Sequence, residues 1–167
     1  MSEKRDPVQA PDSRALAELA ALIRDHRQAV LATLDNGMPY VAMLAYVPEP
    51  DFRSYLVHLS DLSAHKQDLR SDPRCALMIF EPDDGRREIL QHRRLSLVCR
   101  AEFVAKDMPD YDAGRERYLA ALPMHRLMFG LADFDVVRLV PYHGLLNAGF
   151  GRAYRLTPDD LLAASRR

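Results

Sequence analysis

The pattern of hydrophobic and polar positions changes period along the chain, and each change predicts a new element. Between residues 13 and 26 the apolar positions recur at the spacing of one helix face: Leu16, Leu19, Ala20 and Ile23. Asp12 or Ser13 can cap this helix. Residues 29–34 and 40–47 are apolar runs. Asn36 and Gly37 between them predict a type I′ hairpin turn, because both central residues of that turn need a positive φ.

Five further segments have the length and apolar content of strands: residues 54–59, 75–80, 93–104, 134–140 and 144–148. Pro141 is expected to separate the last two, because proline donates no hydrogen bond within a sheet. Helices are predicted at residues 63–72, 111–122 and 157–165, with a short helical turn at 125–130. Seven short strands joined mostly by hairpins, with helices at the periphery, predict a mainly β, α+β fold built as an antiparallel, Greek-key-like barrel.

Composition narrows the function classes. The 167 residues carry a formal net charge of -1 with mixed signs, which offers no electrostatic footprint for nucleic acid. No apolar run is long enough to cross a membrane and no signal peptide is recognised, so we expect a cytoplasmic protein.

Residues 1–11 are polar and proline-containing, which predicts a disordered tail before a single domain at 12–167. Cys75 and Cys99 lie in predicted strands and are expected to be reduced core thiols, able to pair only if those strands are neighbours.

The most informative segment is the end of the strand at 54–59 together with the helix that follows it. Ser63 is a good N-cap, and His65 and Lys66 lie in the first turn, where a cation is unfavourable unless an anion is near. Free backbone N–H groups and positive charge at a helix N-terminus are typical of a phosphate site. The same residues also fit an ordinary capped helix with a solvated lysine, and spacing alone does not separate the two interpretations.

Two stretches carry a resemblance to a known family: residues 30–40, which hold the hairpin turn, and residues 63–78, which hold the helix and the next strand. With them the chain resembles the pyridoxamine 5′-phosphate oxidase-like, FMN-binding split-barrel superfamily. The second half is most similar to the haem-utilisation-like branch, at residues 94–97, 116–119, 133–135 and 149–153. The resemblance implies a split barrel, a homodimer that holds FMN in a cleft between the subunits, and a small-molecule substrate.

The resemblance also implies a set of cofactor-binding residues. They comprise two strands that pass the flavin, a phosphate grip and a contact to the flavin ring: Met43 and Leu44, His58 and Leu59, Ser63, His65 and Lys66, and Arg94. Lys66 would attract the phosphate only from longer range. No residue is singled out as an acid or base, which suits a flavoprotein whose redox chemistry belongs to the cofactor.

The chain departs from the oxidase at the positions that grip phosphate. Ala42, Val47 and Ala64 stand where the oxidase has two arginines and a lysine, and each lost charge-assisted hydrogen bond is worth roughly 1.5–3 kcal/mol when desolvated. Of the oxidase's substrate clamp only the tyrosine, Tyr118, is kept. FMN affinity is therefore expected to be weaker than in the oxidase, and oxidation of pyridoxamine phosphate is not expected.

Three functions stay open at this point. The leading interpretation is an FMN-dependent oxidoreductase of unknown substrate; the others are a haem-binding or haem-utilisation protein on the same fold and a non-catalytic ligand-binding dimer. The six histidines are scattered without metal-ligand spacing, so no metal site is expected. Haem-degrading relatives take their axial histidine from beyond the glycine-rich segment, where this sequence has none, although His125 or His143 could still bind haem.

Overall fold

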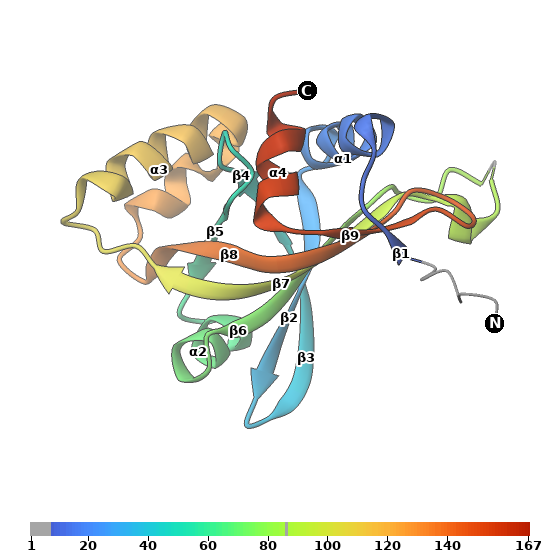
Figure 1. Ribbon diagram of the computed structural model, residues 1–167. Helices are drawn as coiled ribbons and strands as arrows, with labels where there is room; N and C mark the ends of the chain where they lie inside the picture. The colour runs from blue at the N-terminus through green and yellow to red at the C-terminus, as the bar shows by residue number, and fades with distance from the viewer. Residues whose placement is uncertain (1–7, 86) are drawn as a thin grey trace.

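The strands form one mixed sheet that does not close into a barrel, as seen in the computed structural model, which describes residues 8–85 and 87–167 (Figure 1). The sheet order is β1-β9-β8-β7-β6-β2-β3, with β4 and β5 beside this path. The nine strands of the described residues are, in chain order, β1 (Val8–Gln9), β2 (Gln28–Asp35), β3 (Met38–Ala45), β4 (Val47–Pro48), β5 (Tyr55–Ser60), β6 (Arg74–Phe80), β7 (Arg94–Phe103), β8 (Phe134–Asn147) and β9 (Ala153–Leu156). The predicted α+β split-barrel class is confirmed.

The helices lie around the sheet, as predicted. In the described residues they are α1 (Ser13–Asp25), α2 (Ala64–Ser71), α3 (Pro109–Ala121) and α4 (Pro158–Ser165), with the 3-10 helices η1 (Ile89–Gln91) and η2 (Pro123–Gly130). The Asp12 carboxylate accepts a hydrogen bond from the Ala15 N–H at 2.7 Å and so caps α1. None of the helices in residues 8–85 and 87–167 is long and apolar enough to span a membrane.

The hairpin of β2 and β3 forms where the sequence predicts it. Asn36 has φ 49° and Gly37 has φ 84°, the positive values that a type I′ turn requires. Every residue of β2 has a partner in β3, from Gln28 opposite Ala45 to Asp35 opposite Met38. The far end of this hairpin projects away from the rest of the sheet (Figure 1).

The sheet splits along β8. The first part of β8 pairs with β5 and the last part with β9 on one edge, while β7 runs along the other edge. The prediction that Pro141 separates two strands is wrong, because β8 continues through it. Residues 140–143 of β8 pair with neither β5 nor β9, so the N–H that Pro141 lacks breaks no hydrogen bond on that edge. On the other edge, the register of β7 shifts between Val98 and Cys99, which lie opposite His143 and Pro141.

The predicted disordered tail falls mostly on residues 1–7, which lie outside the described residues. Within the rest of it, Val8 and Gln9 instead form β1, paired in parallel with Ala153 and Tyr154 of β9. This pairing joins the two ends of the sequence, which local composition cannot reveal.

Alternation along the central strands separates two faces of the sheet. One face carries fully buried side chains that pack under α1 and α4: Ala29, Leu31, Leu77, Ile79, Leu95 and Leu97. Cys75 and Cys99 lie directly opposite one another on this face, both buried and both free thiols. Burial raises the pKa of the Cys75 thiol to about 12 and also raises that of Cys99, so neither forms a reactive thiolate at neutral pH.

Candidate functional site

The start of α2 is built differently from the predicted phosphate grip. The Ser63 hydroxyl does not cap the helix; it donates to the carbonyl oxygen of Ser60 at 2.6 Å and closes the turn between β5 and α2. The Thr33 hydroxyl, on β2, donates to the Asp68 carboxylate at 2.6 Å in a buried contact that holds α2 against the sheet. The helix N-terminus is therefore fixed in place and receives no side-chain cap.

Lys66 is the main departure at this site. Its side chain has 0% exposure, and its ammonium lies 2.7 Å from an Asp61 carboxylate oxygen, 2.9 Å from one of Asp135 and 2.7 Å from the carbonyl oxygen of Asp133. A buried ammonium persists when its hydrogen bonds are satisfied, and all three oxygens belong to the protein. The expected longer-range attraction of a phosphate does not fit this geometry, because the charge of Lys66 is already neutralised by two carboxylates.

His65 contributes little positive charge either. Desolvation lowers the pKa of its half-buried ring, and the nearby Asp68 opposes this effect. A histidine with a lowered pKa is mainly neutral at pH 7, so at the start of α2 it offers a hydrogen-bonding ring rather than a cation.

His58 and Leu59 point to opposite sides of β5, as neighbours in a strand must. Leu59 belongs to the main core, with 3% exposure. The His58 ring stacks on Phe129 of η2, with ring centroids 3.7 Å apart and planes 8° apart, and it also contacts Tyr118. Both ring nitrogens are buried without a hydrogen-bond partner in the described residues, and burial lowers the pKa of His58 to about 4. His58 therefore packs as a neutral aromatic residue under η2.

Met43, Leu44 and Arg94 complete the predicted set. Leu44 packs against the core, whereas Met43 is 71% exposed on the other face of β3. The Arg94 guanidinium contacts only the carbonyl oxygens of Leu90 and His92, at 3.3 and 3.5 Å, and makes no ion pair in the part of the chain that the structure describes. Arg94 is thus a cation whose counter-charge the described residues do not provide.

One copy of the chain does not bring these residues together. Arg94 begins β7, while Arg70 of α2 lies over the ring of Phe103, which ends β7, at 5.6 Å. At about 3.4 Å per residue the two ends of β7 lie roughly 30 Å apart. A single cofactor that touches both Arg94 and the Arg70 end of α2 would need one of the two from a second copy.

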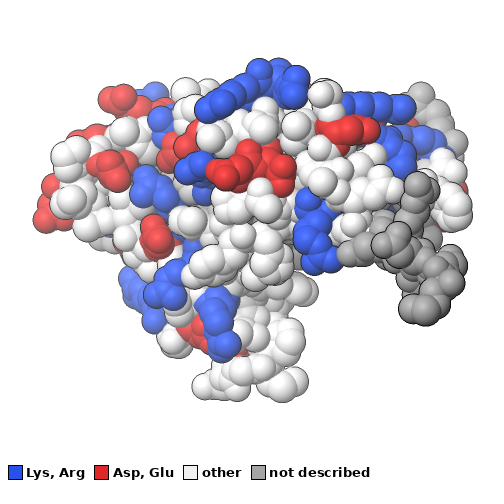
Figure 2. Space-filling view, viewed as in Figure 1, with Lys and Arg blue, Asp and Glu red and all other residues white. Residues whose placement is uncertain are grey.

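Sequence reasoning missed the apolar surface on the side of the sheet opposite α1 and α4. We call it the outward face. The strand registers place its residues in two rows that cross β3, β2, β6, β7 and β8 in that order. The first row is Met43, Val30, Met78, Ser96 and Leu145, and the second is Val41, Ala32, Ala76, Val98 and His143. Several members are exposed despite being hydrophobic, with Met43 at 71%, Val41 at 63% and Val98 at 44%. On the side visible in Figure 2, the projecting end of the β2–β3 hairpin shows almost no charged side chains. A contiguous apolar surface of this kind marks a binding face.

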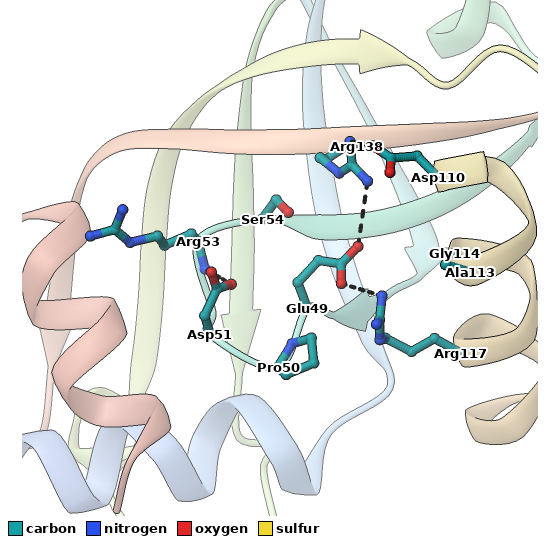
Figure 3. A pocket seen from close by; sticks show the side chains of 10 residues that line it. All are labelled: Glu49, Pro50, Asp51, Arg53, Ser54, Asp110, Ala113, Gly114, Arg117 and Arg138. Atoms are coloured by element: carbon teal, nitrogen blue, oxygen red, sulfur yellow. Dashed lines mark hydrogen bonds and ion pairs between the residues drawn. The ribbon is translucent and has the colours of Figure 1, made fainter. Parts of the chain in front are cut away.

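A second candidate is a cavity of about 470 Å³ between the β4–β5 turn, α3 and β8 (Figure 3). Glu49 lies at its centre, in contact with Arg117 and 3.7 Å from Arg138, which in turn lies 3.7 Å from Asp110. These charges are paired with one another, so the cavity presents no uncompensated group to a ligand. We therefore favour the outward face as the functional surface.

Comparisons with known proteins agree with this fold. A family model described as pyridoxamine 5′-phosphate oxidase matches residues 15–146. Among curated proteins the chain is 28% identical to haem oxygenase HutZ of Vibrio cholerae, over 92% of this chain and 90% of that protein. Among solved structures a haem-binding protein from Mycobacterium smegmatis has a TM-score of 0.80 and 25% identity, covering 93% of this chain and 62% of that one. An FAD-binding protein from Mesorhizobium loti, with a TM-score of 0.62 and 20% identity over 76% of this chain and 87% of that one, shares the fold.

Proposed function

The chain belongs to the pyridoxamine 5′-phosphate oxidase family, and we propose that it binds haem on the outward face of its sheet, between two copies of the chain. This choice departs from the FMN site that the sequence favours. It is supported by the haem proteins among the relatives and by the chemistry of the described residues.

The residues at the start of α2 are a poor match for FMN. A flavin phosphate carries about two negative charges near neutral pH and needs cations or several donors around it. Lys66 is buried on two carboxylates, and His65 has a lowered pKa. Ala42, Val47 and Ala64 have no side-chain donor, and Val47 is only 3% exposed. A phosphate here would rest on backbone N–H groups and the mainly neutral His65 ring, without a free cation from Lys66.

The outward face suits haem better, and its exposed apolar rows are the observation that carries the proposal. Haem presents a broad apolar ring and two carboxylates, so its site needs apolar contact area with a cation at the edge. Met43, Val41 and Val98 offer the contact area. Arg94, which lacks an ion pair in the described residues, offers the cation for a propionate.

His143 is the iron ligand that this face offers. It ends the second row, directly opposite Val98, and its ring is exposed. The other described histidines lie elsewhere. His26 is bonded to the carbonyl oxygen of Leu22, His58 packs under η2, and His92 is buried in a loop. His65 lies in the first turn of α2, and His125 lies in η2 against Tyr118. When bound, haem iron held by a histidine supplies the redox and oxygen chemistry, and the protein sets its access and polarity.

A second copy of the chain would complete the site. An exposed apolar surface of this extent is costly in water, and association of two outward faces would cover it. Pairing would also let Arg94 of one copy approach the Arg70 end of α2 of the other, which a single copy does not allow. The proposed assembly is a homodimer with the ligand in the intersubunit cleft.

Haemin titration of the ligand-free protein tests the proposal. We expect a Soret band that saturates near one haem per chain and that His143→Ala shifts or abolishes. His125→Ala, which alters a half-buried ring in η2, is the matched control and should leave the band unchanged. Arg94→Ala should weaken haem binding by roughly 10-fold or more, as expected for one charge-assisted hydrogen bond.

FMN binding is the second candidate, because α2 begins without a side-chain cap beside Ser63 and His65. The same protein should therefore be titrated with FMN. Tight FMN binding that His65→Ala weakens, together with haem binding that does not saturate, would overturn the haem proposal in favour of the flavin.

A further inference from the structure

The loop between β6 and β7 brings together three side chains that can ligate a metal ion. Asp83 and Asp84 lie in the turn that follows β6, where the Asp83 carboxylate accepts a hydrogen bond from the Gly85 N–H at 2.9 Å. The short helix η1 then returns the chain, so that His92 precedes β7. One ligand atom from each of these three side chains lies within 4.8 Å of the other two.

His92 is the unusual member of this group. It is only 5% exposed, and its Nε2 atom is buried without a hydrogen-bond partner in the described residues. Nε2 lies 3.4 Å from an Asp83 carboxylate oxygen, but the geometry is not that of a hydrogen bond. A buried ring nitrogen left unsatisfied is costly, and this one faces two carboxylates.

We propose that Asp83, Asp84 and His92 form a binding site for a divalent first-row transition metal ion. Two protein ligands at about 2.1 Å from a tetrahedral metal lie about 3.4 Å apart, which is the separation of His92 Nε2 and the Asp83 oxygen. An ion between them would bond to both atoms, and this explains why they face each other without a hydrogen bond. Asp84 is exposed and would turn inward slightly to become the third ligand.

The donor set selects the class of metal. One imidazole with two carboxylates suits Zn²⁺, Mn²⁺ or Fe²⁺, whereas Ca²⁺ and Mg²⁺ prefer oxygen alone. Two carboxylates and a neutral imidazole balance the charge of a divalent ion, and water would fill the remaining positions.

The neighbouring cation sets a requirement for binding. Arg87 lies 3.4 Å from His92 Nδ1 and 3.6 Å from a Glu81 carboxylate oxygen. Metal binding at Nε2 requires a proton on Nδ1, so the contact to Arg87 would be lost. Arg87 could then move fully onto Glu81, which already pairs with Arg93.

Such a site would fasten the loop to the start of β7. The loop carries the exposed side chains of Ile89 and Leu90, at 62% and 59%, and it ends beside Arg94. A bound metal would hold these groups in one arrangement. This inference does not depend on the identity of the cofactor, because all three ligands come from one loop of one chain.

Titration of the full-length, chelator-treated and haem-free protein with Zn²⁺ or Co²⁺ tests the site. We expect one ion per chain by calorimetry, and Co²⁺ absorption bands typical of a mixed nitrogen and oxygen site. Asp83→Asn should weaken Zn²⁺ binding at least 10-fold, because the amide oxygen keeps the bond to Gly85 while the charge is lost. His92→Ala should weaken it similarly.

Glu88→Gln is the matched control, since it removes a negative charge from the same loop outside the proposed ligand set. Its side chain accepts a hydrogen bond from the Leu90 N–H at 2.9 Å, and glutamine can still accept that bond. Zn²⁺ binding should be unchanged in this variant. Absence of saturable Zn²⁺ binding, or an equal loss in Asp83→Asn and Glu88→Gln, would overturn the proposal. Because haem is left out, the result is separate from the test of the haem site.

Discussion

Replacing Lys66 by methionine separates a structural role of this residue from a ligand-binding one. Methionine keeps most of the apolar stem but removes the charge and all donors, so three oxygens lose a partner: those of Asp61 and Asp135 and the carbonyl of Asp133. If the ammonium holds α2 and β8 together, the variant loses stability. If it attracts a ligand, the variant loses affinity instead.

The contacts of Lys66 set the size of the effect. Breaking a buried ion pair from one side costs about 3–5 kcal/mol when the remaining charge is buried. Here Asp61 and Asp135 keep 42% and 23% exposure, and Arg70 still contacts them at 3.2 and 2.9 Å. We therefore expect a loss of about 2–3 kcal/mol in the free energy of unfolding. For a chain of this size that corresponds to a fall in Tm of roughly 4–12 °C.

Urea unfolding followed by circular dichroism measures this loss, with Arg70→Met as the control. The Arg70 side chain is 46% exposed, so its removal should cost under about 1 kcal/mol. The reasoning is refuted if Lys66→Met is no less stable than Arg70→Met, or if it keeps its stability while its affinity for FMN falls.

Three further outcomes are expected. Because burial lowers the pKa of His58 from 6.5 to about 4, the stability that its neutral ring supports should be fully present above pH 6.5 and fall as pH drops to 4. The full shift corresponds to about 3 kcal/mol in the free energy of unfolding, and partial exposure of the residue reduces the expected loss to roughly 1–2 kcal/mol; His58→Leu should flatten that part of a plot of urea midpoint against pH. Met43→Lys on the outward face should shift the mass measured by light scattering toward one chain, while Met124→Lys, 91% exposed on η2, should leave it unchanged. Asp12→Ala should lower the free energy of unfolding by about 1 kcal/mol, and a loss near zero would contradict its capping role.

Local signals predicted most of the fold. The cap at Asp12, the apolar face of α1 and the turn at Asn36 and Gly37 all depend on neighbours within a few residues, and all are confirmed. The errors lie where distant segments meet. Pro141 interrupts no strand because β5 has ended and β9 has not begun on that edge, and β1 exists only because β9 offers it an edge.

The site was harder to predict, for a related physical reason. Sequence position identifies Lys66 as a cation at a helix start, but its ammonium pairs with the carboxylates of Asp61 and Asp135 and donates to the backbone carbonyl of Asp133. Asp61 is a sequence neighbour, whereas Asp133 and Asp135 lie almost seventy residues further along the chain. The outward face is equally hidden, because its rows combine alternate residues from five strands. The grouping of His92 with Asp83 and Asp84 gives no sequence signal, because it depends on how the loop between β6 and β7 returns.

The length of β7 links these observations to function. About 30 Å separates Arg94 from the end of β7, where Phe103 contacts Arg70 in the last turn of α2, so one small ligand does not span these two arginines in one copy. Under the proposed dimer, a second copy that shares the outward face would bring Arg94 and α2 to one cleft. If Met43→Lys separates the copies, it should weaken haem binding as well, because the variant loses both the proposed cleft and part of the apolar contact area, while His143 and Arg94 are intact. Loss of the dimer with full haem affinity would place the ligand within one chain and remove the reason for pairing the outward faces.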